Sequence, residues 1–440
     1  MKNLYFLTVL LMVCLFSACK DDEKTGLKPG ILTECIVTSI NGGALITYSI
    51  PRGVDALYVM AEYERNGQMF TERASAYENS LKIEGFNTMN PVRTALYVVN
   101  RDKSKSEPLF VEFEPLESPI SLTYQSMTLE TGFAGIIAKW ENRAEIELGF
   151  RLMVEEDGKL TDKDMYFSTL SSGAHAFRGF DEVEATFAVS IEDKWGNISD
   201  TMFLTTIPYF EMQIPSADIK DRRDGSGPSK SGLMFDKFRA NSTLTFNRMF
   251  NGVTDGDMDS WTTEPTPDYS EMCAFTIDLG AVYKLSRMIM WPRRRYNNPQ
   301  HVYTVNNVFT FEMWGCKTWD HSKVSAENKA YWLDEFQDWQ TFIPWDGFSP
   351  ETDIPEHTFK DDWVYLGYYE VERLDLAGAT DDEIWAKGEE GHHFDIIAEA
   401  DPVRYIRFFP RSTNLGSPVP KGEFQITELS FFGNNNVPQE

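Results

Sequence analysis

The sequence predicts an all-β protein made of three successive β-sandwich domains. Short segments of alternating apolar and polar residues recur along the chain, bounded by Gly, Pro, Asn or Asp. One series of such segments occurs twice, with matching positions such as Asp102 and Asp193 lying 91 residues apart. A repeat of this size indicates a duplicated domain, because solenoid repeats are far shorter. Most of the Trp residues follow the duplication, in a third domain.

Residues 1–18 have the features of a signal peptide. The apolar stretch Leu4–Phe16 follows a basic start and is too short to cross a membrane. Small residues then precede Cys19, which resembles a bacterial lipoprotein signal, although Phe16 stands where Leu is usual. The resemblance implies that Cys19 carries a lipid anchor. The alternative is an ordinary signal peptide followed by a chance cysteine.

Residues 19–30 are rich in Lys, Asp, Glu, Gly and Pro and are expected to form a tether. Lys20 followed by acidic residues resembles the surface-export signal of Bacteroidota lipoproteins. That resemblance implies a lipid-anchored protein of the outer membrane, exposed at the cell surface. The alternative is a solvated linker.

The net charge of −27 argues against nucleic acid as a partner, because phosphate binding needs clustered Lys and Arg. It also argues against a polybasic membrane contact, which leaves the lipid as the only membrane attachment. After removal of the signal and lipidation, Cys35, Cys273 and Cys316 remain, without metal-ligand spacing. Cys273 and Cys316 either form a disulfide or are buried thiols.

Residues 31–117 and 118–208 contain the two repeats. In each, two alternating segments are joined by a hairpin signal, Asn66-Gly67 in the first and Asp157-Gly158 in the second. The run AVSIEDKWGNIS of the second repeat resembles the penultimate strand and turn of fibronectin type III domains. The resemblance implies two tandem Ig/fibronectin III-like β-sandwiches, with Trp140 in the core of the second.

The third domain, residues 209–434, contains an ordered series of recognisable runs. They are FNGVTDGDMDSWTT, then FTIDLGAVYKLSRMIMWPRRRY (a strand, a Gly turn and a second strand), then VRYIRFFPRSTNLG, and finally FQITELSFFG. Their order resembles the coagulation factor 5/8 type C (discoidin) family, which implies a galactose-binding-like β jelly roll. A long acidic insertion over 317–400 interrupts it, with strands expected only at Trp363–Leu374 and in GHHFDI.

An acidic, Gly-bearing loop in this domain has the composition of a calcium site, because Ca²⁺ takes six to eight oxygen ligands. The discoidin resemblance implies a structural Ca²⁺ completed by a Glu of the last strand. The residues in those places are Asn251, Asp255, Asp257, Ser260 and Glu428. The alternative is a solvated acidic turn.

A basic and aromatic group of residues is expected where loops of the jelly roll meet. In the discoidin family such loops bind sugars, with an aromatic ring against the sugar face and polar side chains on its hydroxyls. The residues in those places are Trp291, Arg293, Arg294, Tyr296, Arg411 and Asn414. The Arg run also suits an acidic sugar or a sulfate. The alternative is that Trp291 is core and the Arg pair with the acidic insertion.

Other Trp residues of the third domain are further candidates for a sugar platform. They are Trp314, Trp319, Trp332, Trp339, Trp345, Trp363 and Trp385, of which one or two are expected to be exposed. His392, His393 and Asp395 have metal-binding side chains, but adjacent residues of a strand point to opposite faces. With no GxSxG, HExxH, P-loop or GxGxxG motif in context, the sequence predicts a protein that is not an enzyme.

The whole arrangement resembles Bacteroidota lipoproteins that accompany starch-utilisation-type glycan importers. It implies a non-catalytic surface protein that binds carbohydrate as part of an outer-membrane glycan-uptake complex. The alternative is a structural or adaptor lipoprotein whose jelly roll binds a partner protein. An exposed aromatic and Arg cluster would favour the first function, and a flat apolar patch on a sandwich would favour the second.

Overall fold

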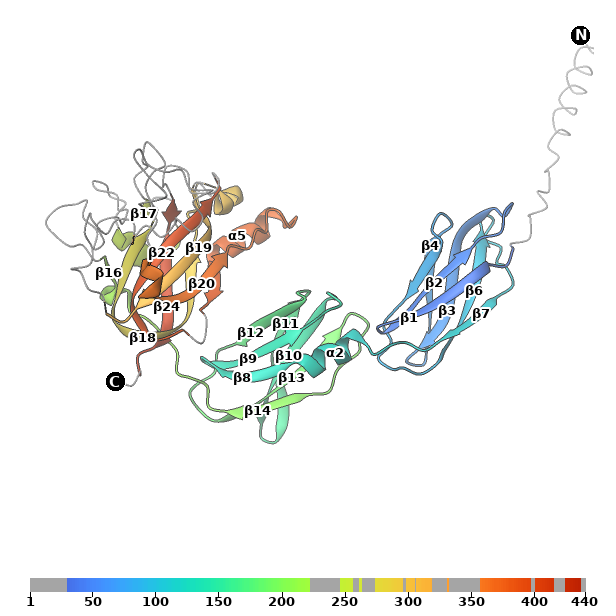
Figure 1. Ribbon diagram of the computed structural model, residues 1–440, viewed down its shortest axis with the longest axis horizontal. Coiled ribbons are helices and arrows are strands. Elements are labelled where there is room, and N and C mark those ends of the chain that lie inside the picture. The colour runs from blue at the N-terminus through green and yellow to red at the C-terminus, as the bar shows by residue number, and fades with distance from the viewer. Residues whose placement is uncertain are drawn as a thin grey trace, which may run out of the picture. The chain divides into compact units, whose positions relative to one another are not determined.

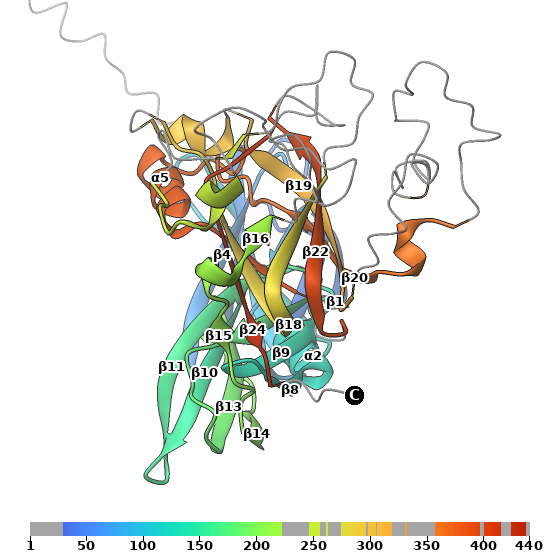
Figure 2. The same ribbon diagram turned by 90° about the vertical axis from the view of Figure 1, so that its left-hand side faces the viewer.

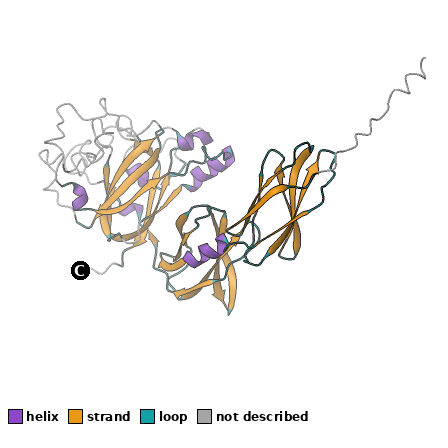
Figure 3. Ribbon diagram, turned by 45° about the vertical axis from the view of Figure 1, so that its right-hand side comes forward, coloured by secondary structure: helices purple, strands orange, loops and turns teal. Residues whose placement is uncertain are grey.

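The computed structural model describes residues 30–221, 246–255, 261–262, 274–295, 298–304, 306–318, 331, 357–396, 400–414 and 424–436. Strands dominate these residues, so the predicted all-β class is confirmed (Figure 3). The chain divides into two compact units. Unit 1 comprises 1–131, 136–177 and 184–207, and unit 2 comprises 132–135, 178–183 and 208–440. The predicted lipid site, Cys19, lies outside the described residues.

The first sandwich pairs a three-stranded with a four-stranded antiparallel sheet (Figure 1). The three-stranded sheet consists of β1 (Thr33–Ile40), β2 (Gly43–Ser49) and β5 (Ser80–Ile83). The four-stranded sheet has the order β4 (Gln68–Ser75), β3 (Ala56–Arg65), β6 (Val92–Asn100) and β7 (Leu109–Phe113). Alternate residues of β2, β3 and β6 point inward, which gives a core that includes Ile46, Tyr63 and Leu96.

The second sandwich has the same sheet orders, as a duplicated domain requires. Its three-stranded sheet consists of β8 (Thr128–Gly132), β9 (Gly135–Glu141) and β12 (Ser172–Phe177). Its four-stranded sheet has the order β11 (Lys159–Ser168), β10 (Leu148–Glu156), β13 (Ala185–Asp193) and β14 (Met202–Thr206). Trp140 is buried against Phe150 and Tyr166, so its predicted core position is confirmed.

Two local features of unit 1 follow directly from its residues. Both predicted hairpin turns form, with positive φ at Asn66-Gly67 and at Asp157-Gly158. A helix that the sequence reasoning missed, α2 (Pro119–Ser126), opens the second repeat. Proline occupies its first turn, and the side chain of Ser118 accepts a hydrogen bond from the Ser121 N–H.

Unit 2 contains a jelly roll in which the long strand β18 (Phe275–Trp291) belongs to two sheets. The first half of β18 lies in the order β16 (Lys220–Asp221), β18, β22 (Val403–Thr413), β19 (Val308–Cys316), β20 (Val364–Glu370). The second half lies in the order β15 (Met212–Gln213), β24 (Glu428–Asn434), β18, β21 (His392–Asp395). A short pair, β17 (Trp261–Thr262) and β23 (Gln425–Ile426), adds to them. Stacked Phe275, Phe311 and Phe408 lie in the core between them.

One expected turn in β18 is absent. Gly280 has a φ of 85° but forms a bulge within a continuous strand, since the pairing with β22 shifts between Asp278 and Tyr283. The expected strand GHHFDI is β21, and the expected strand Trp363–Leu374 ends early as β20.

Short helices also occur in unit 2. The 3-10 turns are η1 (Ser216–Asp218), η2 (Phe246–Phe250), η3 (Pro299–Tyr303) and η7 (Phe359–Asp361). The α-helix α5 (Asp381–Glu390) begins with a capping box of Thr380 and Glu383 and ends at Gly391. Figure 2 shows α5 on the opposite side of the jelly roll from β20. Within the described part of the chain, no helix is both long and apolar enough to cross a membrane.

Candidate functional site

The end of β18 brings the predicted calcium residues next to the predicted sugar residues. Trp291, the last residue of β18, pairs directly with Glu428 of β24. Glu428 is only 3% exposed and accepts hydrogen bonds from the backbone N–H groups of Asn251 (3.1 Å) and Gly252 (3.2 Å). Burial raises the pKa of Glu428 to about 8, although these two N–H groups act to lower it. The last strand therefore holds the start of the acidic loop through Glu428.

Asn251 and Asp255 are the other described members of the predicted calcium set. The side-chain oxygen of Asn251 accepts a hydrogen bond from the Val253 N–H at 2.9 Å, which tightens the loop. Asp255 is exposed at the end of the described part of this loop. Asp257 and Ser260 lie outside the described residues.

Arg294 links this loop to helix α5. Its Nη2 donates to the Thr254 carbonyl at 3.0 Å, and its Nη1 lies 3.5 Å from Glu389 Oε1. Its guanidinium also lies 4.8 Å from the ring centroid of Trp385. Arg294 is 4% exposed, so it holds its neighbours in place from beneath the surface.

Glu389 of α5 receives the indole N–H groups of two Trp residues. Trp291 Nε1 donates to the Glu389 carbonyl at 3.1 Å, and Trp385 Nε1 donates to Glu389 Oε1 at 3.0 Å. Both Trp side chains are partly exposed, and the Glu389 side chain is 59% exposed. The three residues form a surface of two aromatic rings and one carboxylate, which we call the Trp–Glu surface.

Two glycines allow α5 to approach this closely. A Cβ on Gly388 would lie 2.9 Å from Arg294 Cδ and 2.7 Å from Val302 Cγ2. A Cβ on Gly391, whose φ is 84°, would lie 2.9 Å from Trp291 Cε2. The helix is therefore seated directly on the side chains that form the surface.

Arg293 is part of the interior next to this surface. It is 8% exposed, its backbone N–H donates to Asn307 Oδ1 at 2.8 Å, and its Nη1 donates to Gln425 Oε1. Asn307 in turn donates to the Arg293 carbonyl at 2.9 Å. These contacts fix the loop that follows β18.

Arg411 and Asn414 lie at the end of β22 and contact other partners. Arg411 Nη2 donates to Glu312 Oε2 at 2.6 Å. Burial would raise the pKa of the Glu312 carboxyl, but Arg411 and then Lys360 lower it below its ordinary value. Asn414 Oδ1 accepts from the Asn306 N–H at 2.7 Å.

The remaining Trp and Tyr candidates divide between described and undescribed residues. Trp363 is buried, whereas Trp314 is partly exposed beside Tyr365. The others, Tyr296, Trp319, Trp332, Trp339 and Trp345, lie outside the described residues. Sequence reasoning included Trp385 but missed Glu389. The capping-box signal Thr380 to Glu383, followed by Gly391, would have predicted the helix that places Trp385 and Glu389 one turn apart.

The histidines of β21 point to opposite faces, as their adjacent positions predicted. His392 is 3% exposed, whereas His393 is exposed. Burial lowers the pKa of His392 to about 3, with smaller contributions from Lys387 and His393. Among the described residues, no three His, Cys, Asp or Glu side chains gather as metal ligands would.

The structure does not decide between a Cys273–Cys316 disulfide and buried thiols, because Cys273 lies outside the described residues. The Cys316 thiol is buried, and its burial raises its pKa to about 12. That environment disfavours the reactive thiolate.

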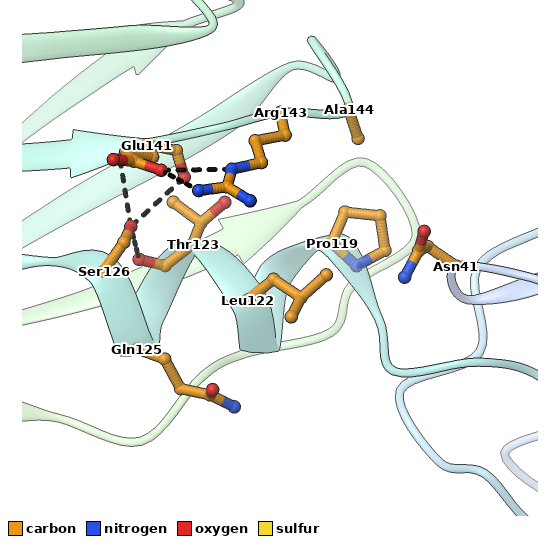
Figure 4. A pocket seen from close by; sticks show the side chains of 9 residues that line it. All are labelled: Asn41, Pro119, Leu122, Thr123, Gln125, Ser126, Glu141, Arg143 and Ala144. Atoms are coloured by element: carbon orange, nitrogen blue, oxygen red, sulfur yellow. Dashed lines mark hydrogen bonds and ion pairs between the residues drawn. The ribbon is translucent and has the colours of Figure 1, made fainter.

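A cavity of about 390 Å³ lies in unit 1 beside α2 (Figure 4). Its charged side chains pair with each other, since Arg143 Nη2 donates to Glu141 Oε2 at 2.8 Å. The lining residues are Asn41, Pro119, Leu122, Thr123, Gln125, Ser126, Glu141, Arg143 and Ala144. None of these residues is aromatic, so the cavity has no ring that could pack against a sugar, unlike the Trp–Glu surface.

Three family models match the chain in succession. Domain of unknown function (DUF4959) matches residues 29–115, and Domain of unknown function (DUF5126) matches residues 116–217. A third, DUF5000, also described as a domain of unknown function, matches residues 250–433. No curated protein matches the chain.

Several solved structures are similar to the chain at low TM-scores. The SusE-like protein BT2857 is 21% identical over 72% of this chain and 99% of that chain, with a TM-score of 0.40. CBM32-3 from a family 31 glycoside hydrolase of Clostridium perfringens is 12% identical over 50% of this chain and 95% of that chain, with a TM-score of 0.28. A two-domain fibronectin type III segment of chicken tenascin is 10% identical over 40% of this chain and 98% of that chain, with a TM-score of 0.20. Similarities this distant do not support an inference about function. Such an inference has to come from the side chains of the site.

Proposed function

We propose that this protein is a non-catalytic surface lipoprotein that binds carbohydrate through its C-terminal jelly roll. The Trp–Glu surface carries the proposal. Partly exposed Trp291 and Trp385 offer aromatic rings, and Glu389 between them offers carboxylate oxygens. Aromatic rings pack against the apolar face of a sugar, and a carboxylate accepts hydrogen bonds from its hydroxyls.

The other residues predicted to bind sugar have different roles in this proposal. Buried Arg294 orients Glu389 and Trp385, and buried Arg293 fixes the loop that follows Trp291. Such support is what a binding site needs to hold its contact groups in one geometry. Tyr296, Arg411 and Asn414 are proposed as contacts of a longer glycan beyond the two Trp residues.

We also propose a structural Ca²⁺ at the acidic loop. Glu428 is buried, and its described partners are the N–H groups of Asn251 and Gly252, with no cationic side chain. A cation would supply the counter-charge that burial makes necessary. Asn251, Asp255, Asp257, Ser260 and Glu428 are the proposed ligands. The ion would stabilise the loop whose Thr254 carbonyl binds Arg294.

The lipid at Cys19, after removal of residues 1–18, is proposed to anchor the protein in the outer membrane at the cell surface. The two sandwiches would then separate the jelly roll from the anchor along the chain. In this place the protein would present glycan to an outer-membrane uptake complex.

The test is glycan binding by the chain that begins at Lys20, first on a glycan array and then by calorimetry. Trp385→Ala and Glu389→Ala are expected to weaken binding about tenfold or more, which corresponds to at least ~1.4 kcal/mol. Tyr77→Ala is the matched control, because Tyr77 is a 92% exposed aromatic residue of the first sandwich and so belongs to unit 1, not to the jelly roll. Absence of binding to every glycan by the folded wild-type chain would contradict the proposal.

An adaptor function is the second candidate, and one observation favours it. On the outer face of β11-β10-β13-β14, Phe167 is 58% and Phe203 is 56% exposed. Phe167 pairs with Gly149, which has no side chain to cover it, and exposed apolar residues of this size are common at protein interfaces. Loss of co-purification with neighbouring surface proteins in Phe167→Ser/Phe203→Ser, with glycan binding unchanged, would support it.

A further inference from the structure

The polar groups of the Trp–Glu surface are unequally available to a ligand. The indole N–H of Trp291 is used by the Glu389 carbonyl at 3.1 Å, and that of Trp385 is used by Glu389 Oε1 at 3.0 Å. An indole has no other hydrogen-bonding atom. The two rings can therefore offer a ligand only their faces, and one face of Trp385 is covered by the Arg294 guanidinium.

The positively charged side chains of Arg293 and Arg294, next to the rings, are buried and are already bonded to other residues. Arg294 is 4% exposed and already contacts Thr254, Glu389 and the Trp385 ring. Arg293 is 8% exposed and contacts Gln425. A sulfate or carboxylate needs direct, bidentate access to a guanidinium for strong binding. Neither of these two Arg residues offers that access.

The exposed charge beside the rings is negative. Glu389 keeps 59% of its side chain exposed, and a carboxylate accepts hydrogen bonds without donating any. The exposed acidic residues of the same helix are Asp381, Asp382, Glu383 and Glu390. Lys387, the basic residue of α5, lies 3.3 Å from Glu390 and is therefore partly neutralised. Glu389 is itself paired with Arg294, but the five acidic residues of α5 outnumber Lys387 and Arg294, so a ligand at the rings meets a negative potential.

We infer that the Trp–Glu surface selects neutral glycans and excludes glycans that carry a carboxylate or sulfate at the contacted sugar. This inference rests on the proposed function and names its substrate class. Hydroxyl groups donate to Glu389, whereas an anion there would face a like charge, with Arg293 and Arg294 both buried. These two Arg residues, which in the sequence suit acidic sugars, thus serve the interior of the site.

The experiment compares one oligosaccharide in two forms on the chain that begins at Lys20. The neutral form is the strongest neutral binder from the array, and the anionic form is the same molecule with its primary alcohols oxidised to carboxylates. By calorimetry in about 0.1 M salt, the anionic form is expected to bind at least about tenfold more weakly. The difference in affinity between the two forms should become smaller in about 1 M salt, since the Debye length falls from about 10 Å to about 3 Å.

Glu389→Gln tests the residue responsible. It keeps one acceptor for Trp385 Nε1 and removes the charge, so the anionic form should gain affinity relative to the neutral form. Glu390→Gln is the matched control, because Glu390 is 57% exposed on the same helix and pairs with Lys387. Its effect on the ratio of the two affinities should be clearly smaller.

The outcomes separate the two claims. If neither form nor any other glycan binds, the proposed function itself fails. If the neutral form binds and the anionic form binds equally or more tightly, only the selectivity is overturned. If the ratio is unchanged in Glu389→Gln, Glu389 does not set the selectivity, and the inference is also overturned.

Discussion

Trp291 and Glu428 lie directly opposite each other in the pairing of β18 with β24. The indole of Trp291 donates to the Glu389 carbonyl on α5, while the carboxylate of Glu428 holds the backbone of Asn251 and Gly252. One residue pair therefore joins the helix of the proposed sugar contact to the loop of the proposed cation site. Because the two places share packed neighbours, substitutions at them are expected to be non-additive.

Glu428→Gln is expected to abolish stabilisation by Ca²⁺. Glutamine retains an acceptor for one of the two loop N–H groups, which bond different oxygens of Glu428, and it lacks the charge that a cation requires. For the wild-type chain, Ca²⁺ at about 100 times its Kd would add ~2.7 kcal/mol to the free energy of unfolding, whereas the variant would gain none. Differential scanning calorimetry with Ca²⁺ and with EDTA measures this stabilisation for the wild type and for the variant.

The control for that experiment is Glu390→Gln, which removes an exposed acid of α5 and should respond to Ca²⁺ as the wild type does. In EDTA, removal of the charge should offset part of the cost of the lost acceptor in Glu428→Gln, because burial raises the pKa of Glu428 to about 8 and so makes its charged form costly. An equal Ca²⁺ shift in both variants would place the ion elsewhere.

Gly391→Ala is expected to destabilise unit 2 more than Gly378→Ala does. Gly378 has a φ of 79°, where alanine costs about 1–2 kcal/mol, whereas Gly391 has a φ of 84° and a ψ of 168°, a region essentially restricted to glycine, where alanine costs about 1–3 kcal/mol. A Cβ on Gly378 meets nothing within 4 Å, but one on Gly391 would lie 2.8 Å from Ile289 Cγ2 and 2.9 Å from Trp291 Cε2. That crowding should add about 1–3 kcal/mol. Urea unfolding of the two variants gives the difference, and equal losses would mean that α5 is not tightly seated on Trp291.

Much of unit 1 could be predicted because its signals are local. The turns Asn66-Gly67 and Asp157-Gly158 depend on residues that accept positive φ, and strand alternation sets which side chains are buried. Helix α5 was missed because its apolar residues are few, with only Ile384 and Gly388 buried. Its capping box was the one local signal available.

The roles of the Arg residues could not be predicted, because their partners are distant in sequence. Arg293 and Gln425 are 132 residues apart, and Arg294 lies 40 residues from Thr254. A run of basic residues beside Trp is typical of an exposed binding loop, and only tertiary structure places these two in the interior. The family resemblance placed Asn251 and Glu428 in one candidate calcium site, which no local pattern suggested, but the hydrogen bonds from the Asn251 and Gly252 backbone to Glu428 were not predicted.

Arg411→Leu is expected to lower the free energy of unfolding by about 2 kcal/mol, because Glu312 would keep its burial and lose its closest cation. Removing one partner of a fully buried pair costs ~3–5 kcal/mol, and the smaller figure reflects an Arg411 side chain that is 24% exposed. In a double-mutant cycle by urea unfolding, Glu312→Gln/Arg411→Leu should recover part of the loss. Additive losses would show that the two side chains are not energetically coupled and would contradict the prediction.

The stability of unit 2 is expected to fall in mild acid through His392. Burial lowers the pKa of this imidazole to about 3, whereas in the unfolded chain it is near 6.5. Between these values the unfolded chain binds a proton that the folded chain does not. Stability is therefore complete above about pH 6.5 and is lost as the pH falls toward 3, with roughly 2 kcal/mol lost between pH 7 and pH 5.

His392→Leu should remove most of this pH dependence, because leucine fills a similar apolar space and does not titrate. Urea unfolding at pH 7 and pH 5 gives the loss for each chain. His393→Gln is the control: its side chain is 43% exposed, its pKa is lowered first by burial, and Glu390 opposes that shift, so its contribution should be smaller. If His392→Leu retains the full acid sensitivity, the titrating group lies elsewhere.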